Sequence, residues 1–290
     1  MSPAARIAAL LGSPVTRLRA VSGGEICRAY AVELADGRRL FAKQAPPGAG
    51  AMMAVEAAGL AWLADGGASV PQVVAGEDDL LVLSWVDGGR ADPEAAHGFG
   101  QALALLHRSG AKSFGAAPPG VRGPGWIGSA GMSFADDGDW PAFFAEHRIW
   151  PYLRAARAAG HVTTAEYDSI ARVCDCIAQL AGPAVPPARL HGDLWHGNLL
   201  WASHGAVLID PAAHGGHPES DLAMLTLFPP DWVREILAGY RSVSPLPDGW
   251  AGRIALHRLF PLLVHAELFG GTYGAAAATQ ARSLVAGRGR

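Results

Sequence analysis

The sequence is poor in cysteine and has no long hydrophobic run. It contains 3 cysteines, Cys27, Cys174 and Cys176, and their spacing matches neither a metal site nor a set of paired cysteines. Such sparse use is typical of a reducing compartment, so we expect a cytoplasmic protein. No window offers about 18 uninterrupted apolar residues, and the first residues lack the apolar stretch of a signal peptide. We therefore expect no membrane span and no membrane partner.

The sequence also lacks a strong charge of either sign. The formal net charge is -3 over 290 residues, and the arginines are scattered rather than clustered. Nucleic acids and anionic membrane surfaces attract clustered basic residues. The pattern therefore predicts no nucleic-acid partner and favours a small or neutral one. The phosphate-cradling sequence G-x-x-x-x-G-K-[ST] of P-loop enzymes is absent as well.

The first 86 residues have the pattern of a small strand-rich unit. Half of the residues in the chain are hydrophobic, which is enough for a sizeable core. Short apolar segments bounded by turn signals predict five strands, at 17–23, 28–35, 38–45, 70–76 and 80–86. Between the third and fourth segments, Met52, Val55, Leu60 and Leu63 recur at helical spacing, and Gly66 is a stop signal. This part is predicted as five strands around one helix, preceded by a short amphipathic helix at the N-terminus.

Beyond residue 92 the periodicity becomes mainly helical. Helices are expected near 219–228, 230–241 and 251–269, among others, and we predict two units, 1–86 and 87–290. The Pro/Gly-rich stretch 115–131 is predicted as a loop. Its "GPGWIG" matches the dinucleotide fingerprint G-x-G-x-x-G, but no strand leads into it and no helix clearly opens from it. We interpret that match as a plain loop.

Polar side chains interrupt the apolar segment 190–212. Asp193 and Asn198 lie five residues apart in a loop, and Asp210 follows twelve residues later. A hairpin between "NLLW" and "AVLID" would bring Asn198 and Asp210 toward each other. Carboxylate and amide oxygens suit Mg²⁺, and a separate carboxylate can accept the proton of an attacking hydroxyl. The segment thus predicts phosphoryl transfer from ATP, with Asp193 as base; the alternative is a set of turn and capping residues.

A lysine and a glutamate of the first unit fit the same chemistry. Transfer from ATP needs a cation on the donor phosphates and a carboxylate that holds this cation in place. Lys43 lies in an apolar strand, and Glu56 follows thirteen residues later on the predicted helix. Taken alone, they would be a solvated strand-edge lysine and a surface glutamate. Gly23 and Gly24 lie where a backbone can approach phosphates, although any hairpin can use glycines.

The motifs in this order resemble the fructosamine kinase (ketosamine-3-kinase) family. Lys43 and Glu56 are followed by "HGDLWHGN", "IDPA" and "ESDLAM", and the resemblance extends from "SGGEI" to "FGGTY". The wider group of similar sequences includes aminoglycoside and choline kinases. The features that restrict the resemblance to the fructosamine kinase family are Trp195, "DWPAFFAEHRIWPYL", "SVSPLPDGW" and "LLVHAELFGGTY". The resemblance implies a bilobal α+β protein-kinase-like fold. Its smaller N-lobe, five strands and one helix, binds the nucleotide, and its larger, mainly helical C-lobe carries the catalytic loop and binds the acceptor.

The resemblance also implies roles for individual residues. Asp193 is the catalytic base, and Asn198 and Asp210 are the magnesium ligands. The residues implied to position or contact ATP are Gly23, Gly24, Lys43, Glu56 and the hinge Ser84, Trp85 and Val86. His191 and Asp221 support the catalytic loop, and Trp195 and His196 are candidates for the acceptor pocket.

Two segments depart from the family pattern. Where the family usually shows Pro-Gln-x-Asn after "IGS", this chain reads "AGMSFADDGDW", which affects the expected acceptor recognition. Relatives often have a redox-sensitive cysteine directly after the loop glycines, whereas Glu25 stands there in this chain. Cys27, two residues later, is interpreted as a buried strand cysteine.

The activity implied is ATP-dependent phosphorylation of a ketosamine, free or on protein, at the sugar 3-hydroxyl, with Mg²⁺ as cofactor and deglycation as the role. The alternatives are a kinase for another small alcohol, such as an aminoglycoside, choline or sugar, and a non-catalytic nucleotide-binding module. Lys43, Asp193, Asn198 and Asp210 together argue against the module, because a scaffold needs no base. We expect a monomer, with a dimer as the alternative.

Overall fold

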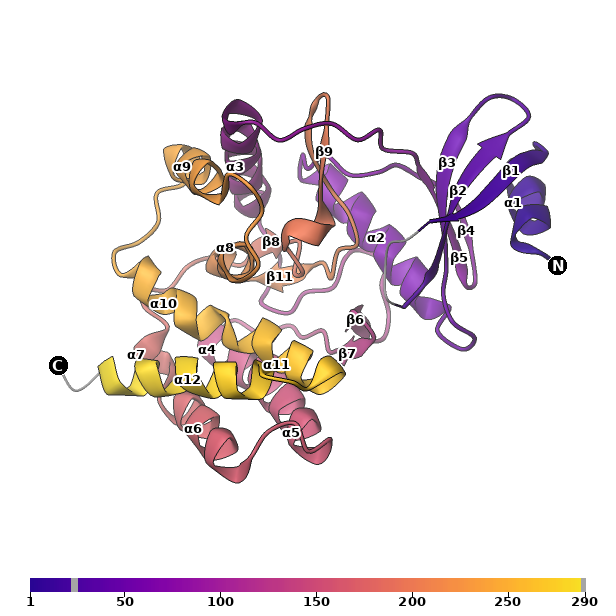
Figure 1. Cartoon of the computed structure of the whole chain (residues 1–290). Helices are drawn as coiled ribbons and strands as arrows, with labels where there is room; N and C mark the ends of the chain where they lie inside the picture. Colours follow the sequence, from indigo (N-terminus) through magenta and orange to yellow (C-terminus); the bar gives the residue numbers. More distant parts are fainter. Residues whose placement is uncertain (22–25, 288–290) are drawn as a thin grey trace.

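The computed structural model describes residues 1–21 and 26–287 of the chain, so Gly23 and Gly24 lie outside the described residues. A five-stranded antiparallel sheet lies at one end of the molecule, and most of the helices lie at the other (Figure 1). In spatial order its strands are β1 (Val15–Val21), β2 (Arg28–Leu34), β3 (Arg39–Gln44), β5 (Leu80–Ser84) and β4 (Val73–Glu77). The five strands predicted from the sequence are confirmed.

Two helices cover opposite faces of this sheet. Ile7 of α1 (Pro3–Leu11) packs in one apolar cluster with Leu80 of β5. Leu60 of α2 (Ala51–Asp65) packs in another cluster with Leu81, the next residue of the same strand. Because successive side chains of a strand point to opposite faces, α1 and α2 lie on opposite sides of the sheet. Helix α2 is the one that extends toward the rest of the molecule (Figure 1).

The remainder of the described chain is mainly helical. Its helices are α3 (Pro93–Arg108), α4 (Trp140–Phe144), α5 (Trp150–Ala158), α6 (Thr164–Asp175), α7 (Ile177–Leu180), α8 (Pro218–Leu227), α9 (Val233–Val243), α10 (Trp250–His257), α11 (Leu259–Phe269) and α12 (Tyr273–Ala286). A π-helical turn, Ala145–Ile149, joins α4 to α5. Within the described ranges, no helix is both long enough and apolar enough to cross a membrane.

Short strand pairs shape the segment that carries the polar motif. Strand β8 (Ala188–Leu190) pairs with β11 (His214–Gly216), so the two ends of residues 191–213 meet at the base of the segment. Between them, β9 (Leu199–Ala202) and β10 (Gly205–Leu208) form the predicted hairpin. A 3₁₀ turn, His196–Asn198, leads into β9. The hairpin therefore returns the chain from Asn198 to Asp210.

Apolar side chains anchor this segment in the helical core. Leu194, Leu199 and Leu208 are buried in one cluster with Leu103 of α3 and Tyr240 of α9. Burial of such side chains contributes roughly 1.5–3 kcal/mol each relative to exposure. The apolar residues between the polar ones therefore hold the loop against the helical core, while its polar groups form hydrogen bonds elsewhere.

Three details differ from the sequence-based expectations. The helix expected at 251–269 is divided at Arg258 into α10 and α11, and Pro261 has no N–H to donate to the carbonyl of His257. The stretch 115–131 is not all loop, because β6 (Gly125–Ile127) and β7 (Ala130–Met132) form a short hairpin. Cys27 is half-buried and precedes β2 rather than lying inside a strand. The division of the chain at residue 86 stays a prediction.

Candidate active site

A buried lysine joins two carboxylates from distant parts of the chain. Lys43 lies on β3, flanked by β2 and β5. Its Nζ donates to Glu56 Oε2 on α2 at 2.7 Å and to Asp210 Oδ1 at 2.9 Å. Burial alone lowers the pKa of Lys43, but the negative charges of Glu56 and Asp210 outweigh burial and raise it above its ordinary value. Lys43 is therefore a fixed positive charge where the sheet meets the hairpin.

The backbone at Asp210 turns this carboxylate toward the lysine. Asp210 has a φ of 53°, in the left-handed region that a non-glycine residue enters at a cost, and its short polar side chain tolerates this better than most. Its side chain is 34% exposed, whereas those of Lys43 and Glu56 are 8% and 11% exposed. Of the three charged groups, Asp210 is thus the one most open to a ligand.

Asp193 and Asn198 are held together by the loop between β8 and β9. Asn198 Nδ2 donates to both the carbonyl oxygen and Oδ2 of Asp193, at 2.8 and 2.9 Å. Because the amide nitrogen is engaged in this way, the amide oxygen of Asn198 is left as the group that can bind a cation. The Ile209 N–H donates to the Asn198 carbonyl at 3.1 Å, so Asn198 and Asp210 flank the same end of the hairpin.

The surroundings of Asp193 make it a weaker acid than an ordinary aspartate. Burial raises its pKa to about 7, and the negative charges of Asp210 and Asp221 act in the same direction. The hydrogen bond from Asn198 opposes this shift. The side chain is still partly exposed to solvent, because Asp193 is half-buried. A half-buried carboxylate with a raised pKa is suited to accept a proton near neutral pH.

Asp221 supports the backbone of this loop from helix α8. Its Oδ2 accepts from His191 N at 2.8 Å, and its Oδ1 accepts from Gly192 N at 2.9 Å. A third bond comes from His107 Nε2 of α3, at 3.1 Å. Burial alone would raise the pKa of Asp221, but hydrogen bonding by His107 and Gly192 and the nearby histidines lower it, so the carboxylate is ionised. This buried anion fixes two consecutive peptide groups next to Asp193.

His191 is an internal brace of the loop. Its Nδ1 accepts from the Asp193 N–H at 3.3 Å, which assigns the proton to Nε2, and Nε2 donates to the Ile209 carbonyl at 2.9 Å. Burial lowers the pKa of His191, so the ring is neutral. Gly192 has a φ of 83°, and a Cβ there would collide with the Ala212 carbonyl oxygen. Glycine is thus required at the point where the loop passes the strand end.

The two remaining loop residues lie at its outer side. The ring of Trp195 lies over Gly197, where a Cβ would collide with the indole. Its ring centroid lies 4.7 Å from that of His196 and 6.5 Å from that of Phe228, the residue that ends α8. Trp195 is half-buried and His196 is exposed. Both are therefore accessible on the loop that carries Asp193, and their role in acceptor binding stays a prediction.

The predicted hinge begins at the last residue of β5. Ser84 forms the last ladder pair, with Leu40 of β3, and its Oγ accepts from Gln72 N at 2.9 Å. Trp85 and Val86 lie beyond that pair and are half-buried. Arg39 stacks on the Trp85 indole at 4.8 Å, which fixes the outer wall of the hinge. The adenine-binding role of these residues stays a prediction.

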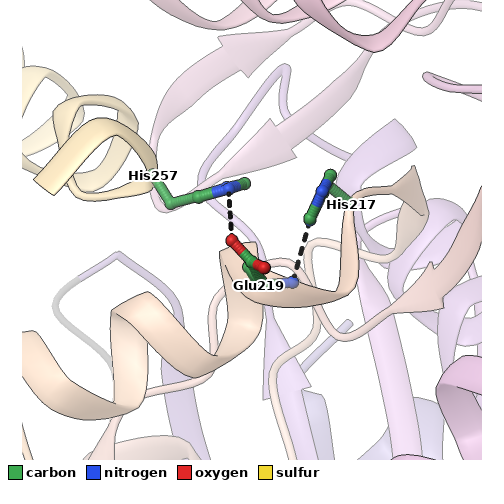
Figure 2. A group of neighbouring side chains, drawn as sticks. All are labelled: His217, Glu219 and His257. Atoms are coloured by element: carbon green, nitrogen blue, oxygen red, sulfur yellow. Dashed lines mark hydrogen bonds and ion pairs between the residues drawn. The ribbon is translucent and has the colours of Figure 1, made fainter. Parts of the chain in front are cut away.

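A second polar cluster is buried at the start of α8. Figure 2 shows His217, Glu219 and His257 pointing toward one another, and their potential ligand atoms lie within 4.8 Å. The arrangement does not fit a metal ion. His217 Nδ1 accepts from the Glu219 N–H at 3.1 Å, so its Nε2 carries the proton and has no free lone pair. Both Glu219 oxygens are held by Arg253, at 3.0 and 2.6 Å.

Arg253 and Glu219 therefore form a buried ion pair between neutral imidazoles. Burial and the neighbouring positive groups lower the pKa of His217 well below its ordinary value, and burial lowers that of His257. The pair fixes the first turn of α8 to α10, two residues before Asp221. It thus secures the helix from which the loop is supported.

Some residues that support the loop lie far from it in the sequence and were not predicted. His107, Tyr240 and Arg253 belong to α3, α9 and α10, yet they complete the support of a loop at 191–198. Tyr240 OH contacts His107 Nδ1 at 2.9 Å, which leaves the other ring nitrogen for Asp221. No spacing along one sequence signals such contacts, because they depend on how the helices pack. The "ESDLAM" motif predicted only Asp221 itself.

Comparisons with known proteins agree with this geometry. A family model described as fructosamine kinase matches residues 1–286. A protein of Thermus thermophilus named "probable ketoamine kinase" is 33% identical over 232 residues, which cover 80% of this chain and 81% of that protein. One of the same name from Synechocystis is 38% identical over 196 residues, covering 67% and 63%.

Solved structures show the same fold. A crystal structure from Thermobifida fusca, provisionally named fructosamine-3-kinase, superimposes with a TM-score of 0.91 at 44% identity, covering 98% of this chain and 99% of that one. An amicoumacin kinase solved with AMP-PNP and Ca²⁺ superimposes with a TM-score of 0.62 at 13% identity, covering 97% and 91%. The latter likeness concerns the fold alone. The kinase-like α+β fold expected from the sequence is confirmed.

Proposed function

The chain belongs to the fructosamine kinase family, and we propose that it transfers the γ-phosphoryl group of ATP to the 3-hydroxyl of a ketosamine. A ketosamine is a sugar-derived amine formed by glycation, either as a small molecule or on a protein. Relatives with 33% and 38% identity carry the name ketoamine kinase, which supports this substrate class.

One observation carries the proposal. The half-buried carboxylate of Asp193 is held by Asn198 and by the backbone that Asp221 supports, and the same segment of chain carries Asp210, which binds Lys43. In the transfer, the acceptor oxygen forms a bond to the γ-phosphorus while the bond from that phosphorus to the bridging oxygen of ADP breaks. The hydroxyl proton passes to Asp193. Asn198 orients the carboxylate for this step through its bond at 2.9 Å.

The donor set also fits a divalent cation. Asp210 offers a carboxylate that is 34% exposed, and Asn198 offers an amide oxygen whose nitrogen is already engaged. Hard oxygen ligands of this kind suit Mg²⁺. When bound, the ion would neutralise charge on the transferring phosphoryl group. A kinase of the same fold was solved with AMP-PNP and Ca²⁺, which supports the use of ATP and a divalent cation.

On the nucleotide side, Lys43 would bind the donor phosphates, and Glu56 would keep its ammonium in place while Asp210 turns to the cation. The hinge at Ser84, Trp85 and Val86 would hold adenine through its backbone. Phosphorylation of the ketosamine destabilises the adduct and allows the free amine to be released, which is a deglycation role in the cytoplasm.

A turnover assay with ATP and a synthetic fructosamine or ribulosamine tests the proposal. We expect ADP formation that depends on the ketosamine and is lost in Asp193→Ala. Activity on an aminoglycoside, choline or a free sugar, with none on any ketosamine, would replace the proposed substrate class. Nucleotide binding without turnover of any alcohol would indicate a non-catalytic module.

A further inference from the structure

A strip of aromatic side chains leads away from the catalytic loop. It consists of Trp195 in the loop, Phe228 at the end of α8, His265 and Phe269 on α11, and Tyr273 at the start of α12. Successive ring centroids lie 6.5 Å apart from Trp195 to Phe228 and 5.1 Å apart from Phe228 to His265. From His265 the strip reaches Phe269 at 5.6 Å and Tyr273 at 4.9 Å.

The strip is accessible along its whole length. All five members are half-buried or exposed, and Phe269, at the outer end of the strip, is 53% exposed. The first part of α11 is different, since residues 259–264 are buried. Large exposed aromatic side chains that adjoin a site are typical of ligand-binding surfaces rather than of random surface. Exposure at the end of an otherwise core helix therefore indicates a contact surface.

A tight turn between α11 and α12 brings the rings at the outer end of the strip close together. Gly270 and Gly271 follow α11 with φ values of 66° and 61°, in the region that favours glycine. They end α11 and reverse the chain into α12, which lies beside α11 (Figure 1). This turn brings Tyr273 back to His265, so two helices share one aromatic surface.

The inner end of the strip is fixed to the proposed base. Trp195 lies two residues from Asp193, and the His196 N–H donates to the Phe228 carbonyl at 3.3 Å. The catalytic loop and the end of α8 are therefore one connected unit. The strip therefore begins on the loop that carries Asp193.

We infer that this strip binds the amine-bearing part of the ketosamine and selects acceptors by the amine they carry. The inference rests on the proposed function. A ketosamine carries its nitrogen on carbon 1, two positions from the carbon that bears the 3-hydroxyl, so the nitrogen would lie on the Trp195 side of the loop when that hydroxyl meets Asp193. The secondary amine is protonated at neutral pH and is attracted to indole and phenyl faces. The substituent on the nitrogen then extends along Phe228 toward Phe269.

The strip fits an apolar or aromatic substituent better than a small anionic one. Several rings in succession extend farther than one sugar ring, and apolar groups gain from stacking on them. A carboxylate beside the aromatic faces gains nothing comparable. We therefore expect the benzylamine adduct of fructose to have a lower KM than the glycine adduct, which carries the same sugar.

The test compares these two acceptors in the wild type and in Phe269→Ala. Because Phe269 is exposed, its removal leaves the core intact. We expect Phe269→Ala to reduce the preference for the benzylamine adduct, measured as the ratio of the two kcat/KM values, by about 5- to 10-fold. The loss should appear in KM rather than in kcat, and Phe269→Tyr should restore the preference.

Leu105→Ala is the matched control, because Leu105 is also a large exposed apolar side chain, 55% exposed, and lies on α3. This variant should keep the wild-type ratio. An unchanged ratio in Phe269→Ala, with normal turnover of both adducts, would overturn the inference and leave the proposed function intact. Wild-type protein that phosphorylates neither adduct would instead contradict the proposed function.

Discussion

Asp221 links the stability of the fold to the geometry of the loop, so its replacement by asparagine tests both. The carboxylate is 1% exposed and accepts from His191 N at 2.8 Å, Gly192 N at 2.9 Å and His107 Nε2 at 3.1 Å. Asparagine has nearly the same shape but presents one oxygen and one NH₂ group. Each carboxylate oxygen of Asp221 accepts from a backbone N–H. In Asp221→Asn, one of these two N–H groups must therefore face the NH₂ group of asparagine instead of an acceptor.

The magnitude follows from these bonds. Losing one charge-assisted hydrogen bond and leaving its donor buried and unsatisfied costs about 2–4 kcal/mol of unfolding free energy. The strained peptide groups adjoin Asp193, and a displacement of the base on the order of 1 Å lowers kcat roughly 100-fold. The KM for ATP should change little, because Lys43 and the hinge lie outside the bonds that are lost.

Urea unfolding and steady-state kinetics, with an acceptor that supports turnover, provide the assay. Asp168→Asn is a suitable control, because Asp168 is exposed on α6 and the substitution removes the same charge. If Asp221→Asn unfolds with a free energy within about 0.5 kcal/mol of the wild type and keeps its kcat, the support of the loop by this carboxylate is refuted.

Other expectations concern the lysine, the buried histidines and the second cluster. Lys43→Met should lower kcat/KM for ATP by about 10²- to 10³-fold, as loss of a phosphate-binding group does; an unchanged value in kinetics at varied ATP would exclude this role. Burial lowers the pKa of His214 to about 3, from an ordinary value of 6.5. Its contribution to stability is therefore complete above pH 6.5 and declines by about 1.4 kcal/mol per unit as the pH falls from 6.5 toward 3. Asp193, whose pKa is raised, acts in the opposite direction, so the comparison is between wild type and His214→Gln, whose unfolding free energy should depend less steeply on pH. If Glu219 is paired with Arg253 rather than with a metal, a chelator should leave the melting temperature unchanged, whereas Glu219→Gln should cost about 3–5 kcal/mol; a chelator-induced drop in melting temperature would contradict the ion pair.

Local signals in the sequence were sufficient for the five-stranded unit and for the motif residues. Strand alternation and turn residues predicted the five-stranded unit, and the short spacing in "HGDLWHGN" placed Asp193 and Asn198 in one loop. The pairing of Lys43 with Glu56 was also predicted, because transfer from ATP needs a cation on the donor phosphates and a carboxylate that holds this cation, and the two side chains are bonded in the structure.

Contacts between distant helices could not be predicted in this way. His107 reaches Asp221 across 114 positions, and the Arg253–Glu219 pair spans 34. These partners are specified by packing rather than by periodicity. The β6–β7 hairpin was missed for another reason: strands of three residues in a Gly-rich stretch are too short to show alternation.

We propose above all that Asp193 activates the 3-hydroxyl of a ketosamine for phosphorylation by ATP. The most direct measurement is the NMR spectrum of the product formed from a synthetic fructosamine, ATP and Mg²⁺, with the rate determined for the wild type and Asp193→Asn. We predict a single phosphate on carbon 3, and a rate lower by about 10²- to 10⁴-fold in the variant. A phosphate on another carbon, or an undiminished rate in folded Asp193→Asn, would contradict the account.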